Sequence, residues 1–301
     1  MPEQKEYFEI SKLTELEARQ YLEEIRWSNG IKCPHCGNDK CYKLEAQKDS
    51  KKPVRDGVYK CSDCRKQFSV TVGTIFEGSH IPLNKWLIAI YLMCSSKKGV
   101  SSNQLHRMLG ITYKSAWFMA HRIRYAMEQS GIDKISGIIE VDETYIGGKH
   151  SGKRGRGSEN KAIVVSLVQR NGIVRSKKFD NLTAKNLKQY IIDNVEKESI
   201  IITDEFRSYR GLNKEFVKHE VVNHGKKEYV RGEVYTNTAE GYFGLLKRGV
   251  NGTFHHISKK HLHRYLSEFD FRYNLRKLND SEIAPILING FEKKRMNYRD
   301  S

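Results

Sequence analysis

The sequence predicts a multidomain protein with an N-terminal zinc ribbon, a helical helix-turn-helix-like module and an α/β domain of RNase H-like fold with a mixed sheet. Two Cys-x-x-Cys pairs within one short stretch predict the ribbon. Two helical patterns joined at a glycine predict the helical module. Three strand patterns, a helix and a fourth strand that ends in aspartate follow the order that is typical of an RNase H-like sheet.

Length and charge narrow the class of protein. A chain of 301 residues exceeds a typical single domain, and its 38% hydrophobic residues exclude a wholly disordered chain. Lys and Arg number 53 against 36 Asp and Glu, so the net charge is +17. This excess indicates a polyanionic partner, with nucleic acid favoured over an anionic membrane surface. No apolar run of transmembrane length and no signal peptide is apparent, so we expect a cytoplasmic protein without a membrane partner.

We expect five segments along the chain. Residues 1–28 carry apolar side chains at helical spacing and predict an N-terminal helix. The zinc ribbon is expected at 29–80 and the helix-turn-helix-like DNA-binding module at 81–130. The RNase H-like catalytic domain is expected at 136–280, followed by a C-terminal basic tail at 281–301.

The four cysteines of the two pairs indicate a metal site rather than disulfides. They stand as CPHC and CSDC, at Cys33, Cys36, Cys61 and Cys64. Four thiolates can hold one tetrahedral Zn²⁺, and the metal then replaces the hydrophobic core that so short a module lacks. Cys41 and His35 stay open as alternative ligands.

The helical module has recognisable start and stop signals. Ser101 or Ser102 can cap a short helix, Gly110 suits a tight left-handed turn, and Thr112 can cap a longer second helix. This pattern predicts a helix-turn-helix that contacts DNA through its second helix, although a helical hairpin that only packs would look similar. The candidate DNA contacts on or near that helix are Lys114, Arg122 and Arg124.

The α/β domain is expected to alternate strands with helices. Runs of β-branched and alternating residues predict strands at 137–146, 162–169, 173–179, 199–204 and 219–223. Apolar residues at helical spacing predict helices at 183–195, 236–248 and 259–276.

Carboxylates stand where two of these strands end. Strand alternation puts Glu140 and Asp142 on one face and Glu143 on the other, and Asp204 directly follows a buried strand. A lone charge at the end of a buried strand is unfavourable, so two in one sheet suggest a divalent cation between them. Glu240, which begins a helix, is a third oxygen ligand of the kind that Mg²⁺ prefers. Taken singly, each of these carboxylates would more often be a solvated strand end.

Two basic residues follow on the same helix. Lys247 lies seven residues after Glu240, which is two turns along the same face, and Arg248 comes next. We expect both to contact DNA, with an ordinary solvated lysine as the alternative for Lys247.

Four stretches carry a resemblance to a known family: CPHC…CSDC, VDETYIGGK, TDEFRSY and YTNTAEGYFGLLKRGVNGTFHHISKKHLHRYLSEFDFRYN. With these motifs the chain resembles the bacterial insertion-sequence DDE transposases. It is most similar to their ISXO-like group, which has an N-terminal zinc ribbon and a C-terminal RNase H-like integrase domain. The resemblance covers about residues 8–280 and is most specific from 236 to 274.

The resemblance implies roles for particular residues. Asp142 and Asp204 would be the two catalytic aspartates, and Glu240, after a gap of 35 residues, would be the third metal ligand with Lys247 as its companion. Because some members of the group have Asn as the third residue, Asn237 is a competing candidate. The cofactors would be structural Zn²⁺ and catalytic Mg²⁺ or Mn²⁺.

The expected function is that of a DNA transposase. Such an enzyme would hydrolyse phosphodiester bonds at the ends of its element and transfer the freed strands into target DNA. It would bind terminal inverted repeats and target DNA as double strands, and it would work as a homodimer or a larger assembly. The alternatives are a non-catalytic zinc-ribbon and helix-turn-helix regulator, and a nuclease that stops after hydrolysis.

Overall fold

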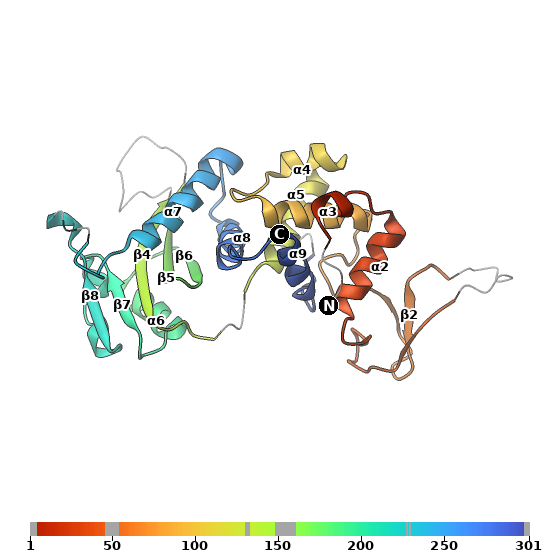
Figure 1. Ribbon diagram of the computed structural model, residues 1–301, viewed down its shortest axis with the longest axis horizontal. Coiled ribbons are helices and arrows are strands. Elements are labelled where there is room, and N and C mark those ends of the chain that lie inside the picture. Colours follow the sequence, from red (N-terminus) through yellow and green to blue (C-terminus); the bar gives the residue numbers. More distant parts are fainter. Residues whose placement is uncertain are drawn as a thin grey trace. The chain divides into compact units, whose positions relative to one another are not determined.

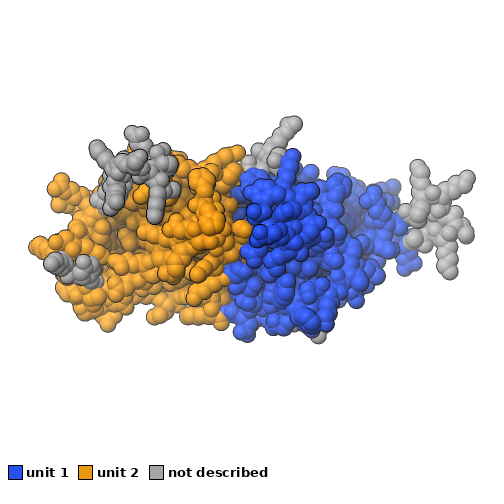
Figure 2. Space-filling view, turned by 90° about the horizontal axis from the view of Figure 1, so that it is seen from above, with its two compact units in different colours: residues 1–96, 102–127, 278–301 blue, residues 97–101, 128–277 orange. Residues whose placement is uncertain are grey.

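The computed structural model of the chain forms two compact units (Figures 1 and 2). It describes residues 5–45, 54–129, 133–147, 161–226, 228 and 230–297. Unit 1 comprises residues 1–96, 102–127 and 278–301, and unit 2 comprises residues 97–101 and 128–277. Part of the predicted ribbon, 46–53, and the end of the predicted tail, 298–301, lie outside the described residues. Within the described part of the chain, no helix is both long and apolar enough to cross a membrane.

Unit 1 begins with two helices where the sequence predicted one. Helix α1 covers Tyr7–Ile10 and helix α2 covers Glu15–Arg26. Thr14 separates them, because its side chain accepts a hydrogen bond from the Glu17 backbone N–H while the Glu17 carboxylate accepts from the Thr14 N–H at 2.8 Å. This reciprocal capping starts a new helix and corrects the prediction of a single helix over 1–28.

The predicted ribbon is a small antiparallel sheet. Its strands β1 (Cys41–Lys43), β2 (Val58–Cys61) and β3 (Gln67–Ser69) pair in the order β1-β2-β3. Tyr59 and Phe68 are its large buried side chains, and Trp27 packs edge-on against both rings. So few apolar residues give little stabilisation, which is why a module of this size usually needs a bound metal.

Four further helices belong to the described part of unit 1. Helix α3 covers Leu83–Ser95, α4 covers Ser102–Leu109 and α5 covers Tyr113–Ala126. Gly110 turns the chain between α4 and α5 with a φ of +59°, and Thr112 caps α5, as predicted. Helix α9 (Asp280–Asn289) packs against α2 and α3, so the predicted basic tail is wrong for these residues. Sequence position suggested a tail, whereas a buried face with Ile283 and Leu287 makes this segment part of the core.

Unit 2 is built on a five-stranded mixed sheet. Its strands are β4 (Ile138–Ile146), β5 (Ala162–Gln169), β6 (Val174–Phe179), β7 (Ile200–Thr203) and β8 (Lys218–Val221), in the order β6-β5-β4-β7-β8. Strands β4, β5 and β6 form an antiparallel meander, while β7 is parallel to β4 and β8 is parallel to β7. The chain order of three strands, a helix and a fourth strand is the one that the sequence predicted for an RNase H-like sheet.

Helices cover both faces of this sheet (Figure 1). Helix α6 (Ala184–Asn194) packs with Ile139, Val141 and Ile201 on one face, together with two short 3₁₀ helices, η1 (Arg207–Tyr209) and η2 (Leu212–Lys214). Helices α7 (Asn237–Gly249) and α8 (Leu262–Asn274) pack on the other. A 3₁₀ helix, η3 (His224–Lys226), follows β8, and a π-helical turn, η4 (Val250–Phe254), extends α7.

Side chains of α8 cover the edge strand β6. The carboxylate of Asp270 accepts hydrogen bonds from the Ser176 backbone N–H at 2.7 Å, from the Ser176 hydroxyl and from the Tyr242 hydroxyl. One turn further on, the Asn274 side chain accepts from the Val174 N–H at 2.7 Å. Burial raises the pKa of Asp270 to about 6 against the lowering effect of these donors. An edge with satisfied N–H groups is protected from pairing with another chain.

We predict that Asp270→Ala destabilises unit 2 by about 3 kcal/mol, because it leaves several buried donors without an acceptor. Urea denaturation followed by circular dichroism measures the change. The matched control is Asp193→Ala, which removes an exposed carboxylate from α6 and should change stability little. Equal effects of the two substitutions would contradict the role given to Asp270.

Candidate functional site

Strand register brings two of the predicted carboxylates together. In the parallel pair of β4 and β7, Glu140 lies opposite Ile202, so continuing the register by two residues sets Asp204 beside Asp142. Carboxylate oxygens of Asp142, Glu143 and Asp204 all lie within 4.8 Å of one another. The prediction that Asp142 and Asp204 meet at one end of the sheet therefore agrees with the geometry.

Glu143 is the member of this cluster that the sequence did not single out. Alternation assigned it to the opposite face from Asp142, and it does contact that face, since the hydroxyl of buried Tyr209 donates to its Oε2 at 2.7 Å. Strand β7 ends at Thr203, so Asp142 and Glu143 both extend beyond the paired part of β4 on that side. The adjacent acidic residues in VDE were the available signal.

Hydrogen bonds fix the orientation of these carboxylates. Asp142 accepts from the Glu143 backbone N–H at 2.8 Å, and Asp204 accepts from the Phe206 N–H at 2.9 Å. Burial, and then the charge of Glu143, raise the pKa of the Tyr209 phenol well above its ordinary value. Tyr209 therefore stays protonated and remains a donor to Glu143 across the physiological pH range.

Crowding of like charges perturbs Asp142. Burial raises the pKa of Asp142 to about 7, and the charges of Glu143, Asp204 and Glu240 add to this effect. A group of carboxylates that disfavour one another's ionisation is relieved by a divalent cation. Mg²⁺ holds oxygen ligands at about 2.1 Å, so opposite ligands are about 4 Å apart. The three carboxylates fit such an ion after small side-chain movements.

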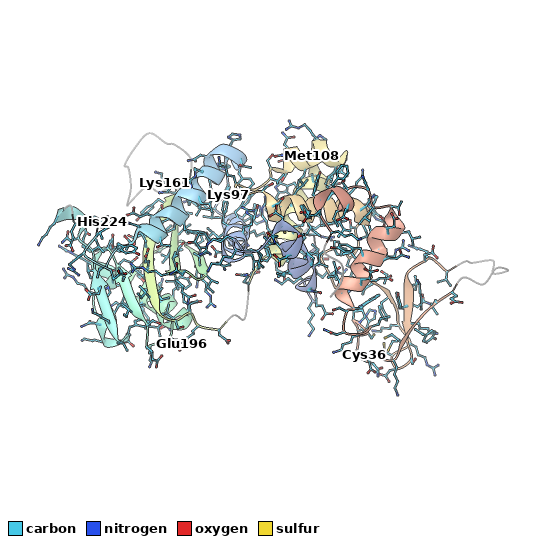
Figure 3. All side chains as sticks on the ribbon, in the orientation of Figure 1. Cys36, Lys97, Met108, Lys161, Glu196 and His224 are labelled. Atoms are coloured by element: carbon cyan, nitrogen blue, oxygen red, sulfur yellow. The ribbon has the colours of Figure 1, made fainter. Side chains whose placement is uncertain are left out.

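Helix α7 carries both candidates for the third ligand. Glu240 and Asn237 lie on its exposed face, one turn apart. Glu240 is close enough for its charge to raise the pKa of Asp142, and its Oε1 lies 4.0 Å from Nδ1 of His224, which Figure 3 labels. Glu240 is not among the carboxylates that lie within 4.8 Å of one another in the described chain. The choice between Glu240 and Asn237 stays a prediction.

The four predicted zinc ligands cluster in unit 1. The Sγ atoms of Cys33 and Cys64 are 3.6 Å apart, as are those of Cys36 and Cys61. A tetrahedral site with Zn–S bonds of 2.3 Å needs sulfurs about 3.8 Å apart, so the cluster fits Zn²⁺. Cys36, labelled in Figure 3, is exposed, whereas Cys33 and Cys61 are buried.

The alternative ligands lie outside this cluster. The Sγ of Cys41 donates to the Asn38 carbonyl at 3.5 Å, and burial followed by the charges of Cys61 and Cys33 raises its pKa to about 11. His35 is exposed and is not among the clustered groups of the described residues.

The structure corrects part of the predicted DNA-binding face. Arg124 is fully buried, and Arg122 is only 7% exposed. Arg122 donates to the carbonyls of Ile75 at 2.8 Å and Met296 at 3.2 Å, which ties α5 to the interior of unit 1. Both arginines were predicted to contact DNA, and this prediction is wrong because both side chains are buried. The sequence could not reveal the burial of Arg122, because the carbonyls it binds are distant along the chain.

Other side chains form the exposed surface of α4 and of the start of α5. Lys114 is exposed there, as predicted, and sequence reasoning missed its neighbours, among them Met108 (Figure 3). The exposed residues are Asn103, Gln104, Arg107, Met108, Tyr113 and Lys114. On helix α7 of unit 2, Lys247 and Arg248 are both exposed as well.

Comparison with known sequences defines the class of protein. The model of the ISXO2-like transposase domain matches residues 134–274, and the model of the transposase zinc-ribbon domain matches residues 13–67. An uncharacterized protein in the transposable element ISH50 of Halobacterium salinarum is 28% identical over 297 residues, covering 91% of this chain and 96% of the relative. An uncharacterized transposase-like protein of Haemophilus influenzae is 31% identical over 111 residues, covering 36% of this chain and 89% of the relative.

The chain belongs to the ISXO2-like family of insertion-sequence transposases. The predicted family, the zinc ribbon and the multidomain fold class are thereby confirmed.

Solved structures give only distant similarity. The crystal structure of the Mos1 strand transfer complex is 12% identical and covers 61% of this chain and 74% of that chain, with a TM-score of 0.22. A pre-cleavage Mos1 transpososome is 11% identical over 61% of this chain and 75% of that chain, also with a TM-score of 0.22. At such low TM-scores the assignment of the fold rests on the strand order and the family models.

We predict one bound Zn²⁺ per chain, lost on Cys33→Ser or Cys61→Ser because three thiolates hold the ion far less tightly than four. Elemental analysis of the purified protein measures it. Cys41→Ser is the matched control, since Cys41 lies beside the cluster and should not be needed for zinc. Loss of zinc from Cys41→Ser alone would refute the four-cysteine site.

We predict that Asp142→Asn makes the metal-free protein more stable. The pKa of folded Asp142 is about 7, above its ordinary 3.8, so its ionisation favours unfolding and stability falls as the pH rises through this range. At pH 8 in EDTA the variant should melt roughly 5 °C higher, as a gain of 1–2 kcal/mol gives in a unit of this size. The difference should shrink toward pH 5.

Thermal melting with and without Mn²⁺ completes this test. Mn²⁺ should raise the melting temperature of the unaltered protein and not that of Asp142→Asn. Glu198→Gln removes an exposed carboxylate of the same unit and serves as the control. A lower melting temperature for Asp142→Asn at pH 8 in EDTA would contradict the charge crowding described above.

Proposed function

We propose that this protein is a DNA transposase that hydrolyses phosphodiester bonds at the ends of its element and transfers the freed 3′-hydroxyl ends into target DNA. The observation that carries the proposal is the meeting of Asp142 and Asp204 at the ends of two adjacent parallel strands, inside the domain that defines the family. Carboxylates in this arrangement suit metal-dependent phosphoryl transfer.

In the proposed mechanism Asp142 and Asp204 are the main ligands of Mg²⁺ or Mn²⁺. Glu240 is the third ligand, with Asn237 as the competing candidate. Bound metal would lower the pKa of the attacking water and stabilise the leaving oxygen. Glu143, held by Tyr209, adds a third carboxylate to the cluster and increases its attraction for cations.

The basic residues are proposed to hold the DNA. A net charge of +17 favours binding to a double-stranded polyanion, with an affinity that falls steeply as salt rises. Lys114 and the exposed α4–α5 surface defined above are proposed to contact the terminal inverted repeats, while Lys247 and Arg248 contact phosphates near the carboxylates. Because two ends must be joined, the active form is proposed to be a homodimer or a larger assembly.

We predict that Asp142→Asn and Asp204→Asn each reduce strand cleavage by at least a hundredfold, since removing a ligand charge weakens metal binding without altering the basic surface. A cleavage assay with Mg²⁺ on DNA carrying the terminal repeats measures this. DNA affinity in a gel-shift assay should stay within about twofold, because these carboxylates do not contribute to phosphate binding.

The same assay distinguishes the two candidates for the third metal ligand, Glu240 and Asn237. Glu240→Gln should reduce cleavage as strongly as the aspartate variants, whereas normal cleavage by Glu240→Gln with loss in Asn237→Ala would transfer the role to Asn237. Adding target DNA tests strand transfer, and cleavage without transfer would make the protein a nuclease. Full activity of both aspartate variants would refute the proposed function.

A further inference from the structure

A third carboxylate on β4, that of Glu140, is fully buried and accepts hydrogen bonds from four donors. Its Oε2 accepts from the backbone N–H groups of Thr238 at 2.8 Å and Ala239 at 3.0 Å. Its Oε1 accepts from the Thr238 hydroxyl at 2.9 Å and from Nε of Arg170 at 2.8 Å. With its oxygens occupied in this way, Glu140 is not suited to be a metal ligand.

Glu140 supplies a cap that helix α7 does not make from its own chain. Thr236 occupies the N-cap position of α7, and its side chain makes no capping hydrogen bond there. The first N–H groups of a helix have no partner within the helix and carry partial positive charge. A carboxylate from the neighbouring strand satisfies two of them and suits the helix dipole.

Arg170 extends this cap to the segment before the helix. Besides Glu140, its guanidinium donates to the carbonyls of Glu233 at 2.6 Å and Tyr235 at 3.0 Å. It also lies 3.6 Å from the centre of the Tyr235 ring. Because Arg170 directly follows strand β5, the start of α7 is held against two adjacent strands of the sheet.

These contacts connect the proposed metal ligands. Glu140 is two residues from Asp142 on the same face of β4, and Ala239 directly precedes Glu240 in α7. The separation of Glu240 from Asp142 therefore depends on the cap between Glu140 and the start of α7.

We propose that Glu140 and Arg170 are positioning residues that hold the first turn of α7 so that its third ligand faces Asp142 and Asp204. This inference rests on the proposed function of the carboxylate site. It assigns Glu140 and Arg170 to the geometry of the site rather than to its chemistry.

A purely structural ion pair would behave differently when both charges are removed together. Removing one partner of a buried pair leaves an uncompensated charge and destabilises strongly, whereas removing both restores much of the stability. The double variant Glu140→Gln/Arg170→Met should therefore regain stability. It still lacks the carboxylate cap, so a positioning role predicts that its metal site remains impaired.

Mn²⁺ binding to the full chain, measured by the electron paramagnetic resonance signal of free Mn²⁺, tests the proposal. Glu140→Gln and the double variant should each bind Mn²⁺ at least tenfold more weakly than the unaltered protein. Hydrogen exchange of the peptide 236–246 in metal-free protein should rise in both. Thr238→Val, which removes one donor without leaving an unpaired charge, should show a smaller effect in the same direction and covers the case in which the others fail to fold.

Further variants distinguish a failure of the proposed function from a failure of the positioning role. Glu17→Gln removes a carboxylate cap from α2 in unit 1 and should leave Mn²⁺ affinity unchanged. If Asp142→Asn binds Mn²⁺ as well as the unaltered protein does, the proposed function fails. If Mn²⁺ binding requires Asp142 while the Glu140, Arg170 and Thr238 variants that fold bind within twofold of the unaltered protein, the positioning role is overturned.

Discussion

The parallel pairing of β4 with β7 is the constraint on which the candidate site depends. It sets Asp204 beside Asp142, whose pKa burial raises to about 7, with the charges of Glu143 and then Asp204 adding to this effect. The pairing is supported by apolar residues of both strands, Ile139, Val141 and Ile201, which pack with α6 on one face. The stability of the sheet thus holds together carboxylates that repel each other. A divalent cation bound between them would replace this repulsion with attraction.

Two carboxylates of β4 show how the same strand serves structure and chemistry. Glu140 is fully buried, and its charge is matched by four donors, one of which belongs to the guanidinium of Arg170. Asp142, two residues further on, faces other carboxylates instead. Buried charges that are paired stabilise the positions of the elements they join, whereas like charges kept close together indicate a site for a cation or a proton. The difference arises because α7 and Arg170 supply donors to Glu140, whereas Asp142 lies beside Glu143 and Asp204.

Local signals in the sequence were sufficient for most of the fold. Strand runs, the aspartates that follow them, the Gly110 turn with its Thr112 cap and the cysteine pairs each depend on nearby residues, and all are found as predicted. Features that depend on distant residues were missed. Glu140 caps a helix 98 positions later in the chain, and buried Arg122 donates a hydrogen bond to a carbonyl 174 positions away. No periodicity in the sequence identifies such partners, because alternation assigns a face to a side chain but not the element that covers it.

Helix α7 carries an acidic residue near its start and basic residues near its end, and this order sets how DNA could lie along the proposed site. Its start is fixed by Glu140 and Arg170, its buried face by the core with α8, and its exposed face carries Glu240 near the start and Lys247 and Arg248 near the end. Seven residues of helix span about 10 Å. Successive nucleotides of one DNA strand advance by about 3.4 Å along the duplex axis, so on a duplex lying parallel to α7 the Lys247 ammonium would meet a phosphate about three steps from the bond at the carboxylates. A helix held rigidly at its acidic end would thus align the strand as well as complete the metal site, since both functions depend on the same cap.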